Sequence, residues 1–303
     1  MLQMRKTGRV LVCALMLGIV ASAEQDDPDI ASFESLIKAK QFLDASRALQ
    51  VYTDAHPQSW QALYQLGYSD FMLHRMQDSV TALCKSIVLH PKFAESHKVL
   101  AYDLNLLGHQ DLAVHELELA IAYNPQSAES HYELGRISYE QGAYLKAVQL
   151  LERAQSLDPS SVRTYHNLGL AYSAIGDHDQ AVKSFDEGLR LNALQPHPSA
   201  WPLIDYATYC NMQSNYGKAR DLLLQAIQIS DKWDQAFEEL SKAFRGLGQT
   251  TEAIDALQKA VLLNPGKAEY HYALARLYTQ THQLAQANQQ LAEYQTLKPR
   301  QQK

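Results

Sequence analysis

Apolar and small residues recur in pairs of helix-length stretches along this chain, and most of these pairs end at a proline. Successive prolines of two sets are spaced by 34 residues: Pro57, Pro91, Pro125 and Pro159, and then Pro265 and Pro299. Proline ends a helix because it lacks an N–H donor and clashes with the preceding turn. The pattern predicts a unit of two helices that is repeated along the chain.

This period divides the chain into eight units. Their bounds are 26–59, 60–93, 94–127, 128–161, 162–195, 200–233, 234–267 and 268–301. The phase is broken once, by four extra residues at 196–199. We interpret this break as a loop insertion; the alternative is a hinge that divides five repeats from three.

Small and large apolar residues keep fixed places within the 34-residue unit. Place 20 is alanine in seven units and serine in one, place 8 is small in seven units, and place 24 is leucine in seven and phenylalanine in one. Two helices approach closely only where side chains are small, so these places predict helix–helix contacts. Glycine at place 15 in four units, Gly108, Gly142, Gly176 and Gly248, predicts a left-handed turn residue between the helices.

This register resembles the tetratricopeptide repeat, a helix-turn-helix unit of 34 residues. The resemblance covers 26–301, so we expect one repeat domain over 24–303. It implies an all-α protein, a right-handed α-solenoid of stacked hairpins. In this family the first helices line a concave groove that binds a protein or peptide, with places 2, 5, 9, 12 and 13 facing the ligand. The final helix is unusually polar, which suits a capping helix that meets water; the alternative is that it docks against another subunit.

The resemblance places an aromatic lining in the N-terminal half of the groove. The candidate binding residues at places 5, 9 and 12 are Tyr64, Tyr68, Phe71, Lys98, Tyr102, Asn105, Tyr132, Arg136, Tyr139, Tyr272 and Arg276. Tyrosine and arginine dominate binding hot spots, so this lining favours a peptide with apolar and acidic side chains. The alternative is that some of these tyrosines pack on neighbouring repeats.

Two segments of similar sequence cover these places in two different units. Residues 131–139 read "HYELGRISY" and residues 271–279 read "HYALARLYT", which are places 4 to 12 of the fourth and eighth units. We expect both tyrosine–arginine pairs, Tyr132 with Arg136 and Tyr272 with Arg276, to face the groove.

A carboxylate-gripping set known in this family is matched only in part. Lys98 fits the first place of that set, but Tyr102 and Glu133 replace two asparagines. Because Glu133 would repel a carboxylate, we do not assign that specificity to this chain.

The residue types of catalytic and metal sites do not converge in this pattern. His97, His131 and His271 share place 4 of different units, which indicates an architectural role. "GDHDQA" at 176–181 is a turn between helices, and its acids suit helix N-capping. No phosphate-binding motif is present, so we expect no catalytic residue, no metal and no cofactor. Cys84 and Cys210 fall in distant units, and we expect them to remain unpaired.

The first 23 residues have the layout of a secretory signal peptide. A basic segment with Arg5, Lys6 and Arg9 precedes an apolar run of 11 residues at 10–20 and an A-x-A site at 21–23. Cleavage there would predict an exported protein, periplasmic or secreted; the alternative is an uncleaved anchor. Removal of three basic residues changes the net charge from −6 to −9, which argues against nucleic-acid binding.

The sequence therefore predicts an exported, non-catalytic scaffold that binds a protein or peptide in a concave groove, for assembly of an envelope or secretion complex. Two alternatives stay open. The chain could be an accessory subunit that presents substrates to a catalytic partner, or it could form homo-oligomers through its C-terminal repeat.

Overall fold

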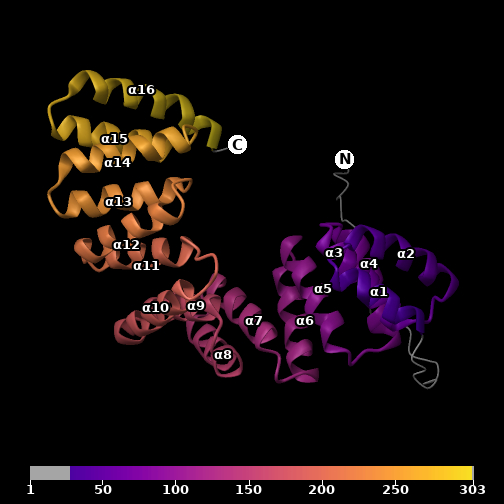
Figure 1. The fold of residues 1–303 in the computed structure, drawn as a ribbon. Helices are drawn as coiled ribbons and strands as arrows, with labels where there is room; N and C mark the ends of the chain where they lie inside the picture. The colour runs from indigo at the N-terminus through magenta and orange to yellow at the C-terminus, as the bar shows by residue number, and fades with distance from the viewer. Residues whose placement is uncertain (1–27, 302–303) are drawn as a thin grey trace, which may run out of the picture. The chain divides into compact units, whose positions relative to one another are not determined.

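The computed structural model describes residues 28–301, and in this part of the chain every regular element is an α-helix (Figure 1). The helices are α1 (Pro28–Lys38), α2 (Phe42–Ala55), α3 (Trp60–Met72), α4 (Met76–Leu89), α5 (Ala94–Leu106), α6 (Gln110–Tyr123), α7 (Ala128–Glu140), α8 (Tyr144–Leu157), α9 (Val162–Ala174), α10 (His178–Ala193), α11 (Trp201–Met212), α12 (Tyr216–Ile229), α13 (Asp234–Gly246), α14 (Thr250–Leu263), α15 (Ala268–Gln280) and α16 (Leu284–Gln301). The all-α prediction is confirmed, and each 34-residue unit holds one hairpin of two helices. The predicted signal segment at 1–23 lies outside the described residues.

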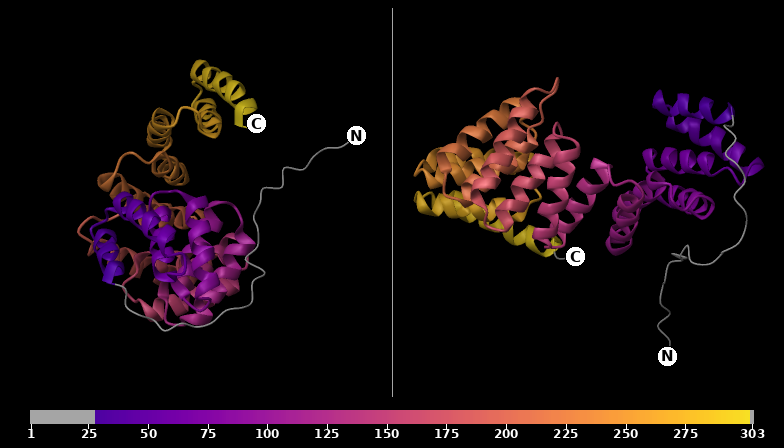
Figure 2. Two further views of the ribbon diagram at one scale, coloured as in Figure 1. Left: turned by 90° about the vertical axis from the view of Figure 1, so that its right-hand side faces the viewer. Right: turned by 90° about the horizontal axis from the view of Figure 1, so that it is seen from below.

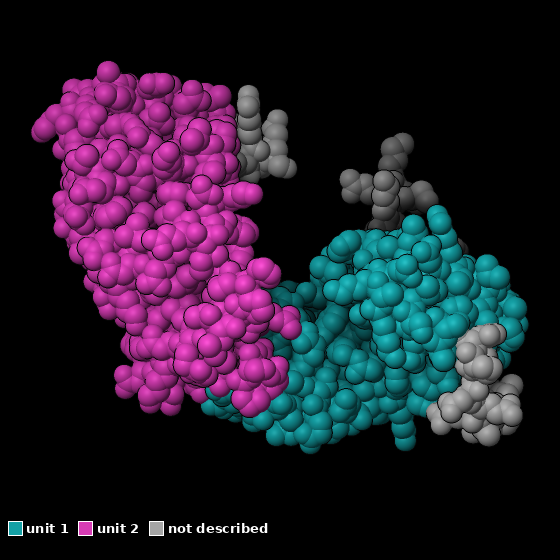
Figure 3. All heavy atoms as spheres, in the orientation of Figure 1, with its two compact units in different colours: residues 1–157 teal, residues 158–303 magenta. Residues whose placement is uncertain are grey.

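The helices form two compact units, with α1–α8 in the first and α9–α16 in the second (Figure 3). Within each unit, consecutive hairpins pack side by side (Figure 1; Figure 2). The boundary follows Leu157, at the end of the second helix of the fourth repeat, and so lies away from the insertion at 196–199.

The insertion is fastened to the end of α10. The side-chain amide of Asn192 donates to the carbonyl oxygen of Ser199 over 2.8 Å, and the Ser199 N–H donates to Asn192 Oδ1 over 2.9 Å. Ala200, which follows, is buried. These contacts hold Ser199 against the end of α10, and the interpretation as a loop insertion stays a prediction. Pro202 falls in the first turn of α11, where the missing N–H has no helical acceptor.

The two helices of a hairpin meet where place 8 of the first faces place 24 of the second. A Cβ atom on Gly67 would lie 2.6 Å from Leu83 Cγ, and one on Gly169 would lie 2.6 Å from Phe185. The same approach brings Gly135 against Leu151. At these three positions a Cβ atom would require the facing side chain to shift, which explains why glycine stands there opposite a large residue at place 24.

The turn inside every hairpin needs one left-handed residue at place 15. The predicted glycines adopt it, with φ between 75° and 81°. The other four hairpins use non-glycine residues with φ between 57° and 61°: Lys40, His74, Ser214 and His282. Glycine was therefore an incomplete signal, because the hairpin geometry imposes this conformation on whatever residue is present.

The last helix ends the second unit with a polar surface. Gln286, Asn288 and Gln289 on α16 are exposed, as a capping helix requires. Gln290 is different, because its side-chain oxygen lies 2.7 Å from His271 Nδ1 on α15. Self-association through this repeat stays a prediction.

Two alanine substitutions would separate the backbone effect at place 15 from a general effect of removing glycine. At Gly248 and Gly217 the added Cβ would have open space, but only Gly248 has positive φ. We expect Gly248→Ala to lower the free energy of unfolding by about 1 kcal/mol because an L-residue is strained there. Gly217→Ala, in the first turn of α12, should be neutral or stabilising by up to about 1 kcal/mol. Urea unfolding of both variants would test this, and equal effects would contradict it.

Candidate functional site

In the first unit, the predicted aromatic lining is a row of rings in mutual contact. Tyr64 meets Tyr68 at 6.3 Å and Phe93 edge-on at 4.9 Å between ring centroids. Tyr68 also meets Phe42 of the preceding repeat at 6.3 Å. All four side chains are half-buried or partly covered by these contacts, so the rings hold repeats together and offer only part of their surface to a ligand.

The row continues toward the third repeat through Phe71 on α3 and Tyr102 on α5, whose ring centroids lie 5.8 Å apart. Both are half-buried against the hydrophobic core of this unit. Burial raises the pKa of Tyr64, and the charge of Glu95 and the neighbouring Tyr68 add to this, so the Tyr64 phenol stays neutral. This part of the face is therefore largely aromatic, with a neutral hydroxyl group at Tyr64.

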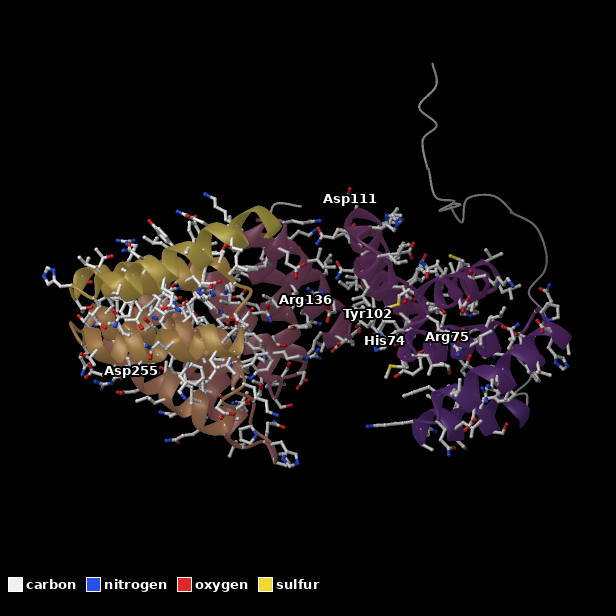
Figure 4. All side chains as sticks on the ribbon, turned by 90° about the horizontal axis from the view of Figure 1, so that it is seen from above. His74, Arg75, Tyr102, Asp111, Arg136 and Asp255 are labelled. Atoms are coloured by element: carbon white, nitrogen blue, oxygen red, sulfur yellow. The ribbon has the colours of Figure 1, made fainter. Side chains whose placement is uncertain are left out.

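The predicted basic residues of this face are already paired. Lys98 forms an ion pair with Glu95, three residues earlier on α5. Arg136 on α7, which Figure 4 labels, donates from Nε to Glu133 over 2.9 Å and also pairs with Glu140. Burial opposes the charge on Arg136, but the two carboxylates outweigh it and raise the Arg136 pKa. An acidic ligand would have to compete with these carboxylates.

The other predicted residues of α5 and α7 differ in exposure. Tyr132 is only 7% exposed, so the expectation that it faces a ligand needs correction: it belongs to the core. Asn105 and Tyr139 are half-buried, and the Tyr139 ring lies 5.4 Å from that of Tyr144. Tyr139 and Asn105 thus keep some surface, whereas Tyr132 has almost none.

The eighth repeat carries the similar sequence at residues 271–279, but its tyrosine and arginine differ in exposure and in ion pairing from those of the fourth repeat. Tyr272 is 44% exposed, and its ring lies 5.1 Å from that of Tyr294 on α16. Arg276 is exposed and forms no ion pair within 28–301. The places that hold Glu133 and Glu140 around Arg136 hold Ala273 and Gln280 around Arg276.

Two hollows lie along the first helices of the second unit. One, of about 330 Å³, is lined by Thr208, Asn211, Met212, Tyr216, Glu239, Lys242, Arg245 and Gly246. The other, of about 370 Å³, is lined by Arg245, Ala275, Arg276, Leu277, Thr279, Gln280 and Leu291. Most of these residues occupy places 9, 12 and 13 of α11, α13 and α15, which the resemblance assigns to the groove.

Arg245 is the residue that sequence reasoning missed. It sits in the last turn of α13, is exposed and lines both hollows. The sequence register puts Arg245 at place 12, which the resemblance assigns to the groove. The candidates predicted from the sequence, however, were mostly aromatic residues of the first unit, such as Tyr64. Of the predicted residues, only Arg276 lines either hollow.

Two lysines and two glutamates near these hollows form a network of ion pairs. Lys242 Nζ lies 2.8 Å from Glu238 and 2.7 Å from Glu239. Lys267 Nζ lies 3.2 Å from Glu238 on the other side. Burial opposes the charge on Lys242, but hydrogen bonds to the two carboxylates raise the Lys242 pKa overall. The network neutralises these groups and leaves Arg245 and Arg276 outside it.

Comparison with protein families supports the repeat register. Models described as "Tetratricopeptide repeat" match residues 160–232 and 244–301, and one described as "TPR repeat" matches 135–176. The chain belongs to the tetratricopeptide repeat family. A comparison with curated proteins found no match.

Solved structures share the tetratricopeptide fold. The Cut9–Hcn1 hetero-tetramer of the APC/C aligns with a TM-score of 0.67 at 17% identity over 83% of this chain and 49% of that one. A tetratricopeptide repeat protein from Parabacteroides merdae aligns with a TM-score of 0.62 at 15% identity, over 82% and 97% of the two chains. PilF of Pseudomonas aeruginosa aligns with 0.61 at 24% identity, over 72% and 97%.

The histidines at place 4 of the tetratricopeptide unit have the predicted architectural role. Nε2 of His97, His131 and His271 lies 2.8, 3.2 and 3.0 Å from the carbonyl oxygen of the proline that closes the preceding repeat. Burial opposes protonation of His97, but Glu116 and the Pro91 carbonyl raise its pKa overall. Burial lowers the pKa of His131, which has no such carboxylate.

The described residues hold no close group of three or more metal-ligating side chains. Asp177 of "GDHDQA" caps α10 by accepting a hydrogen bond from the Gln180 N–H over 3.1 Å, as predicted. Cys84 and Cys210 form no disulfide; Cys210 is buried, whereas Cys84 is half-buried. In the part of the chain that the structure describes, no helix combines the length and apolar character needed to cross a bilayer.

The most perturbed carboxyl group is Asp103 on α5, which the sequence analysis did not single out. Its side chain is 0% exposed and so cannot contact a ligand. Asp103 Oδ2 lies 2.5 Å from Ser79 Oγ, which lies 2.8 Å from the Gly67 carbonyl oxygen. The Ser79 hydroxyl has one proton, so it donates either to the charged Asp103 carboxylate or to the Gly67 carbonyl oxygen; when Asp103 is protonated, Asp103 can donate to Ser79 and Ser79 to Gly67, so that both bonds form.

Burial raises the pKa of Asp103 to about 7, helped by the negative charge of Asp70 and opposed by the hydrogen bond with Ser79. An unfolded aspartate has a pKa of about 3.9, so the folded state binds the extra proton between about pH 4 and pH 7. Because the folded state binds more protons there, this group makes stability fall as pH rises through that window.

The variant Asp103→Asn should remove this pH dependence, because an amide can donate to Ser79 at any pH. We expect its free energy of unfolding, relative to the unmodified protein, to increase by more than about 1 kcal/mol between about pH 5 and about pH 8. Urea unfolding at both pH values would measure it. Asp111→Asn, at an exposed aspartate on α6, is the control and should show no such increase. A constant difference for Asp103→Asn would contradict the buried proton.

Proposed function

We propose that this tetratricopeptide repeat protein is a scaffold that binds a protein or peptide along the first helices of its hairpins. The observation that carries this proposal is the position of the two hollows in the second unit. They are lined by the same places of three consecutive first helices, α11, α13 and α15, and they share Arg245. A repeated set of places gives an extended ligand a repeated set of contacts.

The two units offer different surfaces to such a ligand. In the first unit the first helices present half-buried aromatic rings, and Lys98 and Arg136 are held in ion pairs. In the second unit they present exposed cations, an exposed methionine at Met212 and polar side chains. We infer that the second unit supplies the polar selectivity and the first unit apolar contact.

A scaffold function, rather than catalysis, fits the environment of the perturbed groups. Asp103 is enclosed, and the place-4 histidines bind backbone carbonyls. The supporting role for a separate catalytic partner remains the alternative, in which the same surface would hold the substrate.

We also propose export, with assembly of an envelope or secretion complex as the setting. The support is the basic, apolar and A-x-A layout of residues 1–23. A fusion of these residues to a reporter that is active only outside the cytoplasm should be active. Arg substitution of two residues within the apolar run, Leu11 and Leu15, should abolish that activity, since the run must be apolar to be recognised. An inactive fusion, or one unaffected by the arginines, would reject export.

A crosslinking pair in the second unit tests the binding surface. Met212 on α11 and Leu262 on α14 are both 73% exposed, but only Met212 lines a hollow on the first-helix face. A photo-crosslinking amino acid at each position in turn should trap a partner at Met212 and not at Leu262, and excess unlabelled protein should compete. Equal trapping at both positions would show that the first-helix face is not the binding surface.

A further inference from the structure

Arg245 and Arg276 are two arginines that line one hollow and have no ion-pair partner among the described residues. Both are exposed, and neither forms an ion pair within the described residues. They come from different repeats, α13 and α15, so the packing of the two hairpins brings them to the same hollow. Arginine offers a fork of N–H donors that matches a carboxylate, so such a pair suits an anion.

The surroundings leave these two charges available. Glu238 and Glu239 on α13 are already bound by Lys242 and Lys267, and Asp234, at the start of the same helix, accepts hydrogen bonds from Asn264 and Tyr270. The hollow itself is lined by no acidic residue; beside the arginines it has the hydroxyl of Thr279, the amide of Gln280 and apolar carbon from Leu291. The positive charge therefore faces neutral groups, and an anion in the hollow would meet no carboxylate among the lining residues.

We propose that Arg245 and Arg276 form the anchor for an aspartate or glutamate side chain of an extended acidic peptide segment. This proposal rests on the proposed function and specifies the chemistry of its ligand. Bulk electrostatics works against it, because the chain carries a net charge of −6. Non-specific attraction would select basic peptides, so a preference for acidic ones would have to come from a local site.

In the fourth repeat, the arginine at the equivalent place is occupied by carboxylates of its own helix. Arg136 occupies the place of Arg276, but Glu133 and Glu140 bind it from three residues before and four after. At the corresponding places Arg276 has Ala273 and Gln280. Introducing glutamate at these two places should give Arg276 internal partners and exclude a carboxylate from the hollow, on a helix face that tolerates the same pattern in α7.

A displayed library of random dodecapeptides would test the anchor with the purified full chain as target. We expect the selected peptides to be enriched in aspartate and glutamate relative to the unselected library. The enrichment should be lost with Arg245→Gln/Arg276→Gln and with Ala273→Glu/Gln280→Glu. It should persist with Lys183→Gln/Lys259→Gln, which removes the same charge from exposed positions on the second helices α10 and α14.

The affinity of one selected acidic peptide would then be measured by fluorescence anisotropy. Both groove variants should bind it at least about tenfold more weakly, since a charge-assisted bond to an arginine pair is lost. The lysine control should bind within about twofold of the unmodified protein, because screened surface charges contribute little. Circular dichroism of each variant would show that the helices are retained.

The outcomes separate this proposal from the one on which it rests. Selection of peptides without acidic enrichment, or enrichment that survives both groove variants, would overturn the anchor and leave the binding scaffold intact. Failure of the full chain to select any peptide above background, together with equal crosslinking at Met212 and Leu262, would overturn both.

Discussion

The close approach of the two helices within each hairpin is the constraint on which the remaining structure depends. At place 8 a Cβ on Gly67 or Gly169 would collide with Leu83 or Phe185, so the helices pack at a distance that only small residues allow. The hairpin geometry imposes positive φ on the turn residue, whether it is glycine or not, and it leaves one face of the first helices for a ligand. Helix–helix packing within the hairpin thus determines the structure of each repeat, and the stacking of repeats determines which face of the first helices is exposed.

What distinguishes one repeat from another is the set of partners around a shared residue. Arg136 and Arg276 occupy the same place of their units, yet one is held by two carboxylates and the other by none in the described part of the chain. His97 and His131 bond to equivalent proline carbonyls, of Pro91 and Pro125, yet their pKa values shift in opposite directions because only His97 has a glutamate beside it. Equivalent places in the repeats thus give side chains the same backbone position, whereas the residues around each side chain determine its ion pairs and its pKa.

The fold could be predicted from the sequence because the 34-residue period, the small residues at fixed places and the prolines that close the units all indicate the same helix–helix packing. The helix bounds follow the predicted units, and the insertion at 196–199 explains the one change of phase. The site was less readable. A place in the register shows that Tyr132 or Arg136 lies on a first helix, but burial of Tyr132 and pairing of Arg136 depend on contacts beyond that place. Ala273 and Gln280 were visible signals of a free Arg276, but their meaning needs the carboxylate contacts seen around Arg136.

The relay from Asp103 through Ser79 to the Gly67 carbonyl joins α5, α4 and α3. In thermodynamic language, the hydrogen ion on Asp103 is a ligand of the folded first unit, with a dissociation constant set by a pKa of about 7. Because burial raises this pKa to about 7, Asp103 can gain or lose its proton near neutral pH, and the first unit then exists as two species that differ by one internal proton. A small change in the acidity of its surroundings would shift their ratio, with no groove residue taking part.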